Sequence, residues 1–438
     1  MNEWKKVKIG DFLTEREGRY KPNDKEISKY QRLDKIDFSG HIHISDKPTK
    51  TDMIIVFPGD LIISGINVAK GAISVYQGKE PVCATIHYSS YTFDDKKVDL
   101  DYFKYFVKSP AFIFALQQQV KGGIKTEIKP KHLLPLEISL PDLSTQKEIV
   151  KVLSKKIEKV ELIKSEIESQ KAYAKQLRQN ILQEAIEGKL TEEWRKKNPV
   201  VKGNPDFDAE VLFEKIQEEK CHTDSKKKVF EPIAENELPF EIPEGWKWVR
   251  LGEICEGFMY GTSAKSLPSG KCPVLRMGNI QNGKIDWEKL VYTNNDEEIE
   301  KYLLKQYDLL FNRTNSREMV GKTAIFESTQ KTIYAGYLVK FRPINSNPYF
   351  VNIVLNSKTH REWCNEVKTD ALGQSNINAE KLKNFVAPLP PLAEQKEIVS
   401  RVEKLLANVT ELEKQITERE TLTKQMLQSI MKDVFREV

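Results

Sequence analysis

An internal repeat constrains this sequence more than any other feature. Residues 140–150 read LPDLSTQKEIV and residues 389–399 read LPPLAEQKEIV, with eight of eleven positions identical at an offset of 249. Residues 4–11 (WKKVKIGD) resemble residues 246–253 (WKWVRLGE) at an offset of 242. Each copy spans about 190 residues, which is too long for a solenoid repeat. We therefore expect a duplicated two-part unit with pseudo-two-fold symmetry.

Each copy begins with a block that mixes short apolar runs and turn signals. Residues 53–64 (MIIVFPGDLIIS) predict two strands around Pro58-Gly59, and GAISVYQ, KTAIFES and YLVKFRP predict further strands. Residues 102–120 and 348–367 predict one helix each, in matching places. GDLIIS (59–64) aligns with YDLLFN (307–312), so Asp60 matches Asp308. The pattern predicts an α+β domain that occurs twice.

The segments after the two LP motifs predict long helices. No proline or internal glycine occurs between Ser144, a candidate N-cap, and Gly188, a candidate stop. Heptad-like apolar positions predict that the two helices pair as an antiparallel coiled coil. The predicted seam contains Ile149, Leu153, Val160, Ile163, Ile167, Ala174, Leu177 and Ile181, and in the second copy Ile398, Val402, Leu405, Val409, Leu412, Ile416, Met426 and Ile430.

These patterns divide the chain into five segments. They are a first globular domain (1–139), a central helix (140–190), a charged linker (191–245), a second globular domain (246–388) and a C-terminal helix (389–438). The linker sequence predicts one short helix and then an extended entry through LPFEIPEGW.

Charge is distributed unevenly along the 438 residues. Lysine and arginine outnumber acidic residues by four in 1–139 and by five in 246–388, whereas acidic residues lead by five in 191–245. Two basic blocks are compatible with two footprints on a polyanion. No apolar stretch is long enough for a membrane span, no signal peptide is evident, and five scattered cysteines form no CxxC pair. We expect a cytoplasmic protein with reduced thiols, no membrane association and no metal site.

Motifs for catalysis are incomplete. Gly321-Lys322-Thr323 resembles the end of a phosphate-binding loop, but the required upstream glycine is Ser316, so a turn into a strand is the better interpretation. Asn347–Phe350 (NPYF) lacks the second proline of an amino-methyltransferase motif, and His41 with His43 do not complete a zinc site. We interpret the chain as non-catalytic, with no catalytic residue, metal or cofactor of its own.

Two similar basic domains on a helical frame suit a ligand with two separated parts, such as duplex DNA with two half-sites. At this point the sequence strongly resembles the specificity (S) subunits of type I restriction–modification systems. The resemblance rests on both LPxLxxQKEIV motifs, ILQEAIEGKLTEEWRKKNP, LPFEIPEGWKWVRLGEI and FNRTNSREMVGKTAIF, and covers essentially the whole chain. It implies that each globular block is a target recognition domain that reads one half of a bipartite, asymmetric DNA site. It also implies two docked methyltransferase (M) subunits for adenine methylation, and restriction (R) subunits for cleavage. Those partners would use S-adenosylmethionine, ATP and magnesium.

Candidate DNA contacts are donor-rich clusters that the repeat places in both blocks, since arginine suits guanine and asparagine suits adenine in the major groove. In the second block they are Arg276, Asn279, Gln281, Asn312, Arg313, Thr314, Asn315, Arg317, Lys322, Gln374, Ser375 and Asn376. In the first block they are Arg32, Lys35, Ser64, Asn67, Lys70, Lys121, Lys125 and Thr126. Structural roles as loop caps or surface ion pairs are the alternative for each.

The repeated QKE triplets are candidate docking residues for the two methyltransferase subunits. They are Gln146, Lys147 and Glu148 in the first copy and Gln395, Lys396 and Glu397 in the second. Favourable charge at a helix start is the alternative explanation, although it accounts for the glutamates better than the lysines. Two other functions stay open. The chain could serve a fused restriction–methylation polypeptide, or it could be a coiled-coil scaffold that binds only protein.

Overall fold

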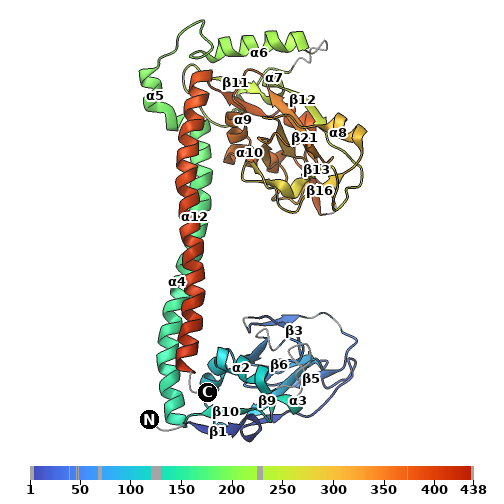
Figure 1. Cartoon of the computed structure of the whole chain (residues 1–438), viewed down its shortest axis with the longest axis vertical. Coiled ribbons are helices and arrows are strands. Elements are labelled where there is room, and N and C mark those ends of the chain that lie inside the picture. The colour runs from blue at the N-terminus through green and yellow to red at the C-terminus, as the bar shows by residue number, and fades with distance from the viewer. Residues whose placement is uncertain are drawn as a thin grey trace. The chain divides into compact units, whose positions relative to one another are not determined.

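The computed structural model describes residues 4–38, 40–45, 47, 49–67, 72–119, 130–223, 230–371 and 373–435. The chain forms two compact units. Unit 1 contains residues 1–169 and 416–438, and unit 2 contains residues 170–415. Each unit therefore combines one globular domain with a segment of both long helices (Figure 1).

The domain of unit 1 is built on two four-stranded sheets with the orders β2-β9-β6-β7 and β4-β3-β8-β5. Its strands are β1 (Lys5–Lys8), β2 (Leu13–Glu15), β3 (Arg32–Ile36), β4 (Ile42–Ser45), β5 (Met53–Val56), β6 (Leu61–Ser64), β7 (Ile73–Val75), β8 (Val82–Thr85), β9 (Tyr88–Phe93) and β10 (Glu137–Leu140). Its helices are α1 (Leu100–Phe106), α2 (Pro110–Gln119) and α3 (Pro130–Leu133). The two strands predicted around Pro58-Gly59 are β5 and β6.

The domain of unit 2 repeats this plan with the sheet orders β12-β21-β17-β19 and β16-β13-β20. Its main strands are β11 (Lys247–Arg250), β12 (Cys255–Tyr260), β13 (Cys272–Leu275), β16 (Val291–Thr293), β17 (Leu309–Asn312), β19 (Thr323–Ile325), β20 (Ile333–Tyr334), β21 (Leu338–Pro343) and β24 (Val386–Leu389). Its helices are α7 (Leu251–Ile254), α8 (Asp296–Tyr302), α9 (Pro348–Val354), α10 (Lys358–Val367) and α11 (Ala379–Lys383).

The two domains match strand by strand in their central sheets. In both, the second sheet contains one parallel pair, β3–β8 in unit 1 and β13–β20 in unit 2. Unit 2 adds a hairpin of β14 (Ile280–Gln281) and β15 (Lys284–Ile285), and a small sheet β18-β23-β22, built from β18 (Thr314–Asn315), β22 (Thr369–Ala371) and β23 (Gln374–Asn376). The predicted α+β fold class with an internal repeat is confirmed.

Each domain is closed by pairing of its first strand with its last. β1 pairs antiparallel with β10, and β11 pairs antiparallel with β24. The prolines of the LP motifs follow directly, and the long helices begin two residues after Pro141 and one residue after Pro391. The chain thus enters and leaves each domain at the same place, next to the start of its long helix.

The aligned aspartates Asp60 and Asp308 have the same structural role in the two domains. Both are buried, and each carboxylate accepts a hydrogen bond from the amide three residues upstream, at Phe57 (2.9 Å) and Lys305 (2.7 Å). An arginine neutralises each charge. Arg16 Nε lies 2.6 Å from Asp60, and Arg342 Nε lies 2.9 Å from Asp308. A buried carboxylate is tolerated here because it is both paired and hydrogen-bonded.

The helices expected over 102–120 and 348–367 are each two helices, so this prediction is corrected. The break falls at Ser109 between α1 and α2, and at Ser357 between α9 and α10. Both serine hydroxyls accept a hydrogen bond from an amide three residues later, at Phe112 (3.3 Å) and His360 (3.2 Å). Serine at this position starts a new helix because its side chain satisfies a free N–H group of the first turn.

The long helices are α4 (Leu143–Ile186) and α12 (Leu392–Val434). The N-cap of α4 is Asp142 rather than Ser144, because the Asp142 carboxylate accepts a hydrogen bond from the Thr145 amide at 2.8 Å. Gly188 follows its end in the left-handed conformation (φ 72°), as predicted for a helix stop.

Within each unit, the two helices run antiparallel. In unit 2, Arg178 contacts Glu413 (2.9 Å) and Arg401 donates to the Leu190 carbonyl (2.7 Å), whereas in unit 1 Arg419 contacts Glu166 (3.1 Å). The buried seam recurs strictly every seven residues, and its members match across the repeat. They are Leu153, Val160, Ile167, Ala174 and Ile181 on α4, and Val402, Val409, Ile416, Thr423 and Ile430 on α12. A seven-residue repeat is the signature of a left-handed coiled coil.

The seam is narrower than the sequence pattern indicated. Leu177, Leu412 and Met426 were expected inside it, but they are 44%, 42% and 46% exposed. The repeat-equivalent Tyr173 and Leu422 are 69% and 63% exposed. Two helices bury one stripe between them, so apolar residues beside that stripe stay in contact with solvent.

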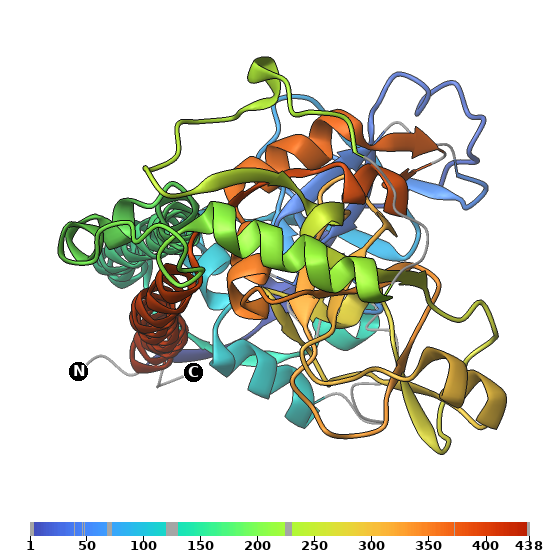
Figure 2. The ribbon, with the colours of Figure 1, turned by 90° about the horizontal axis from the view of Figure 1, so that it is seen from above.

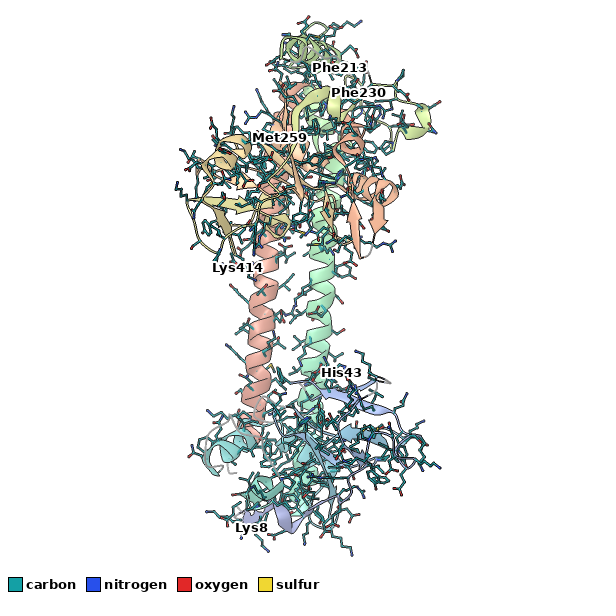
Figure 3. All side chains as sticks on the ribbon, turned by 90° about the vertical axis from the view of Figure 1, so that its right-hand side faces the viewer. Lys8, His43, Phe213, Phe230, Met259 and Lys414 are labelled. Carbon is teal, nitrogen blue, oxygen red and sulfur yellow. The ribbon has the colours of Figure 1, made fainter. Side chains whose placement is uncertain are left out.

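The linker belongs to unit 2 and packs on its globular domain. It contains α5 (Glu192–Lys197) and α6 (Ala209–Thr223), and α6 lies over the second domain beside α7 (Figure 2). Gln217 donates to the Glu253 carbonyl at 3.0 Å, and Phe213 of α6 lies against this domain (Figure 3). Among the described residues, no helix is long and apolar enough to cross a membrane.

Candidate nucleic-acid interface

The small sheet β18-β23-β22 brings together two of the clusters that the sequence analysis named separately. Thr314 pairs with Asn376, and Asn315 pairs with Ser375, across β18 and β23. The predicted Asn-rich loop is therefore the end of β17 followed by β18. Residues from 312–317 and 374–376 share one surface element, although about 60 residues separate them in the sequence.

Arg313 is the centre of this surface. Its guanidinium carbon lies 4.5 Å from the ring centroid of Tyr260, and its terminal nitrogen Nη2 donates to Asn376 Oδ1 at 3.3 Å. Asn376 in turn donates to Thr314 Oγ1 at 2.8 Å. Stacking on an aromatic face and one hydrogen bond fix the guanidinium plane, which is the geometry that bidentate recognition requires. Within the described part of the chain, Arg313 Nε is buried and has no hydrogen-bond partner.

Two tyrosines beside Arg313 are exposed. Tyr260 is 42% exposed and Tyr337 is 47% exposed, and the Tyr337 carbonyl accepts a hydrogen bond from the Arg313 amide at 2.9 Å. Arginine with flanking tyrosines is the composition of recognition surfaces, since each offers a rigid contact at a small entropic cost.

Arg317 lies at the edge of the same sheet. Its guanidinium pairs with Asp370 of β22, and the buried Ser375 hydroxyl also donates to that carboxylate. The Arg317 hydrogen bond, followed by that of Ser375, lowers the pKa of Asp370. Arg317 is itself 74% exposed, so the pair is solvent-screened and lies open to a ligand.

Lys322 joins the third predicted cluster to this surface. Its ammonium donates to Gln281 Oε1 at 3.0 Å, so Gln281 lies next to the turn before β19. Burial lowers the pKa of Lys322, and the positive charges of Arg361 and Lys175 lower it further. The expected turn into a strand at Gly321–Thr323 is confirmed, with Gly321 in a left-handed conformation (φ 90°).

Other predicted contacts in the second domain have structural roles. Asn279 is 4% exposed, and its amide donates to the carbonyls of Asp286 (2.8 Å) and Glu288 (3.0 Å). Asn312 and Ser375 are fully buried. Since a buried amide or hydroxyl cannot reach a base edge, we assign these three to the framework. Arg276, Asn315 and Gln374 lie at or near the surface and remain predictions.

In the first domain the predicted residues are more dispersed. Arg32 and Lys35 lie on β3, where Arg32 Nη2 contacts Asp34 at 2.6 Å and Lys35 is exposed. Ser64 is 5% exposed at the end of β6, and Asn67 follows in the next turn. Lys70, Lys121, Lys125 and Thr126 lie outside the described residues.

Gln146 and Gln395 anchor the long helices to their domains. Both are fully buried. Gln146 Oε1 accepts from the Asp99 amide at 2.7 Å, and Gln395 Oε1 accepts from the Asn347 amide at 2.8 Å. Asp99 and Asn347 are the N-caps of α1 and α9, so the contact is the same in both copies. Each glutamine also donates to the carbonyl five residues upstream (2.8 and 2.9 Å). These contacts leave no side-chain surface for a docked subunit.

The other residues of the QKE triplets stay accessible. Lys147, Glu148 and Lys396 are exposed, whereas Glu397 pairs with Arg401 at 2.6 Å. These four residues remain predictions as docking residues.

A buried carboxylate that the sequence analysis did not name stabilises unit 2. Glu394 is 1% exposed and accepts hydrogen bonds from Thr191 (2.6 Å), from Trp246 Nε1 (2.7 Å) and from Arg195. It thereby joins the start of α12, the linker and the first residue of the second domain. The repeat-equivalent residue in unit 1 is Thr145. The available signal was the Thr145/Glu394 difference, one of the three positions at which the two motifs differ.

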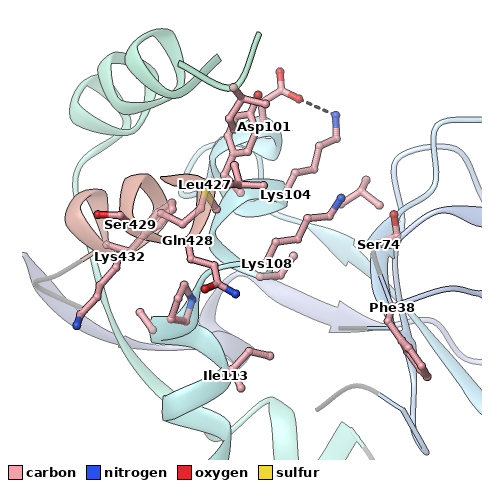
Figure 4. A pocket seen from close by; sticks show the side chains of 18 of the residues that line it. Phe38, Ser74, Asp101, Lys104, Lys108, Ile113, Leu427, Gln428, Ser429 and Lys432 are labelled. Atoms are coloured by element: carbon pink, nitrogen blue, oxygen red, sulfur yellow. Dashed lines mark hydrogen bonds and ion pairs between the residues drawn. The ribbon is translucent and has the colours of Figure 1, made fainter. Parts of the chain in front are cut away.

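Unit 1 has an open hollow between its domain and the long helices. The hollow measures about 1670 Å³, and its lining includes Lys104, Lys108 and Ile113 on one side and Leu427 and Gln428 of α12 on the other (Figure 4). Lys432 and Ala111 also line it. At the equivalent positions of unit 2, Gln183 and Thr359 are joined by a hydrogen bond of 2.9 Å.

Comparison with known proteins is consistent with this architecture. The model of the type I restriction modification DNA specificity domain matches residues 1–170 and 243–419. The EcoKI specificity subunit of Escherichia coli (strain K12) is 27% identical over 390 residues, which is 87% of this chain and 75% of that protein. The putative MjaX specificity subunit of Methanocaldococcus jannaschii is 34% identical over 202 residues, 44% of this chain and 46% of that protein.

A solved structure from work on complex assembly and conformational transition of the type I R-M system has the same fold. Its TM-score is 0.61 at 16% sequence identity, covering 99% of this chain and 98% of that one. The two segments that the family model matches, residues 1–170 and 243–419, are the two copies of the repeat, and each includes part of a long helix. The chain therefore belongs to the type I restriction–modification DNA specificity family, and it is a specificity subunit rather than a catalytic one.

Proposed function

We propose that this protein reads a bipartite, asymmetric DNA site, one half-site with each globular domain. The observation that carries the proposal is the Arg313 surface of unit 2, where an arginine held between Tyr260 and Asn376 lies beside exposed tyrosines. Unit 1 has the same fold but a different set of polar residues on it. Different residues on one framework read different sequences, and so an asymmetric site follows from a repeated fold.

Arg313 is the residue proposed to read a base. A guanidinium oriented by stacking matches the O6 and N7 acceptors of guanine in the major groove. Its buried Nε, which has no partner among the described residues, is a donor that DNA binding could engage after a small rotation. Gln374 and Asn315 on the same small sheet are proposed neighbours in this contact.

We further propose that two methyltransferase subunits dock on the long helices, and that restriction subunits join that complex. The support is a pair of exposed apolar residues four positions apart that occurs twice, Tyr173 with Leu177 on α4 and Leu422 with Met426 on α12. Residues four apart lie on one helix face, and the two pairs are related by the repeat. One surface present twice suits two copies of one partner. Lys147, Glu148 and Lys396 are proposed to extend it. S-adenosylmethionine, ATP and magnesium would bind to the partners, and we propose a cytoplasmic location for the complex.

The first test is genome-wide adenine methylation with the gene present, deleted and replaced by an Arg313→Lys variant. We expect the wild type to support one gapped, two-part motif that disappears on deletion. The variant keeps the charge but loses bidentate geometry, which is worth about 1–3 kcal/mol of base discrimination. It should relax one position of one half-site and leave the other half-site unchanged.

The second half-site is the internal control in this experiment. Relaxation of both half-sites, or of neither in an active variant, would contradict the assignment of Arg313. If deletion removes no motif, binding of the full chain to a co-expressed methyltransferase decides between a silent system and a protein-only scaffold. In that binding assay, Leu177→Asp together with Met426→Asp should abolish capture.

A further inference from the structure

Three cations without a carboxylate partner converge in unit 2, between α4 and the second domain. They are Lys175 of α4, Lys322 before β19 and Arg361 of α10, here called the Lys322 cluster. In the described part of the chain, none of the three lies within 4 Å of a carboxylate oxygen.

The protein backbone and Gln281 hold two of these cations in place. Lys322 donates to Gln281 Oε1 at 3.0 Å, and Arg361 Nη1 donates to the Val320 carbonyl at 2.6 Å, two residues before Lys322. Both side chains are partly buried, so their positive charges are only partly screened by water. Like charges held close together without an anion raise the free energy of the free protein.

Lys175 reaches the same place from the long helix. It lies one heptad before Leu182, which is buried in the core of unit 2, so it is on the face of α4 that points at the second domain. About two turns beyond Lys175, Gln183 Oε1 accepts a hydrogen bond from the Thr359 amide (3.1 Å), two residues before Arg361. The positive charge of Lys175 contributes to the lowered pKa of Lys322, after burial and the charge of Arg361.

Three carboxylates of unit 2 are paired with cations outside the cluster. Glu187 pairs with Lys189 (2.5 Å), Glu413 pairs with Arg178 (2.9 Å), and Glu362 lies 3.6 Å from Lys358.

The other copy of the repeat has no such cluster among its described residues. Ala72 is equivalent to Lys322, and Ile113 is equivalent to Arg361, so both positions are apolar. Lys424 is equivalent to Lys175, but it pairs with Glu420 at 2.8 Å. The cluster is therefore a feature of unit 2 and not a requirement of the shared fold.

We propose that the Lys322 cluster binds a backbone phosphate of duplex DNA, so that the spacer helix α4 itself contacts the DNA through Lys175. This inference rests on the proposed DNA-reading function and assigns to one copy a contact that the other lacks. A phosphate supplies the missing anion without reading sequence, and it would fix the position of DNA against α4 as well as against the domain. Lys175 lies on α4 and not in the globular domain. Its contribution to DNA affinity therefore distinguishes this proposal from DNA binding by the domain alone.

The test compares Lys175→Ala with Lys424→Ala in the full chain. Both residues are exposed helix positions related by the repeat, so neither change should alter folding, which a thermal melt verifies. The measurement is the affinity for a mixed-sequence duplex at several salt concentrations. Loss of one phosphate contact reduces the slope of log K against log salt by about one unit. We expect this reduction in Lys175→Ala and not in Lys424→Ala.

Equal slopes in the two variants would overturn the proposal. A second variant, Lys322→Gln, should reduce the slope as Lys175→Ala does, and the double variant should reduce it no further, because both residues serve one phosphate. Additive reductions would show two separate contacts and would also overturn it. Failure of the proposed function itself is distinguishable, since the wild-type chain would then show no salt-dependent binding.

Discussion

Helices α2 and α10 occupy the same place in the two domains, and they begin alike and then diverge. Each starts at a serine whose hydroxyl accepts from an amide three residues later. At that third residue α2 has Phe112, whereas α10 has His360, and both are buried. One position on, Ile113 lines the open hollow of unit 1, whereas Arg361 is part of the Lys322 cluster.

The difference shows which interactions the repeat retains and which it varies. The glutamine at each helix start, the strand pairing that closes each domain and the capped aspartate are present twice. The residues on the outer face of α2 and α10 are not. A shared framework needs the first group, because those contacts are buried and directional. The outer face can change without loss of the fold, because its side chains make none of these shared buried contacts.

Among changes that affect only one copy of the repeat, Glu394→Ala should cause the largest loss of stability. It leaves Arg195, Trp246 and Thr191 without their shared acceptor in a buried place, which should destabilise unit 2 by about 3–4 kcal/mol. Urea unfolding followed by tryptophan fluorescence reports this, because five of the six tryptophans lie in unit 2. Thr145→Ala, at the equivalent position of unit 1, is the control and should change stability by less than about 0.5 kcal/mol. Equal losses would mean that the two helix starts depend on the same contact.

Gln146→Met and Gln395→Met should instead act equally on the two copies. Each removes a buried acceptor from an N-cap amide, at an expected cost of about 2–3 kcal/mol in its own unit. Hydrogen–deuterium exchange should show faster exchange at the amide of Asp99 in the first variant and of Asn347 in the second. Exchange that changes in only one of them would contradict the equivalence of the two junctions.

The dependence of stability on pH should distinguish α10 from α2, because α10 has the titratable His360 where α2 has Phe112. Burial lowers the pKa of His360 from its usual 6.5 to about 3, and the charge of Arg361 adds to the shift. The unfolded chain therefore binds a proton below pH 6.5 that the folded one does not. The stabilisation is complete above pH 6.5 and declines as the pH falls toward 3, by about 2 kcal/mol at pH 5.

His360→Phe, which installs the residue of unit 1, should remove this part of the acid sensitivity. Unfolding of both proteins at pH 7 and pH 5, followed by tryptophan fluorescence, provides the comparison. An unchanged difference between the two pH values would show that His360 is not the titrating group.

The repeat made the fold predictable to the level of its parts. Two nearly identical motifs located both long helices, and the alignment of Asp60 with Asp308 correctly matched the central sheets of the two domains. The seam was predicted too wide, because a heptad pattern cannot tell Leu177 beside the stripe from Ile181 within it. Two helices bury only one such stripe, and which residues fall beside it depends on the contact geometry.

The candidate site was predictable in composition but not in arrangement. The string around Arg313 stood out by its donors, yet its partner Asn376 and the stacked Tyr260 come from distant strands. Gln146 and Gln395 were misjudged for the same reason. A glutamine that occurs in both copies indicates the same interaction in both. Only the fold shows that its partner is an N-cap amide inside the protein and not a docked subunit. Lys175 and Arg361 carried no motif, since their significance arises from proximity to Lys322.

Strand pairing at the base of each domain has a consequence for inheritance. Because β1 pairs with β10 and β11 pairs with β24, the first and last strands of each domain lie side by side next to the start of its long helix. A genetic exchange with one breakpoint at each strand of such a pair would insert a complete domain, with both of its ends already in the correct place. Gln146 or Gln395, at the start of the unchanged long helix, would then hydrogen-bond to the inserted domain. Such an exchange would replace the residues proposed to read one half-site and leave both long helices unchanged.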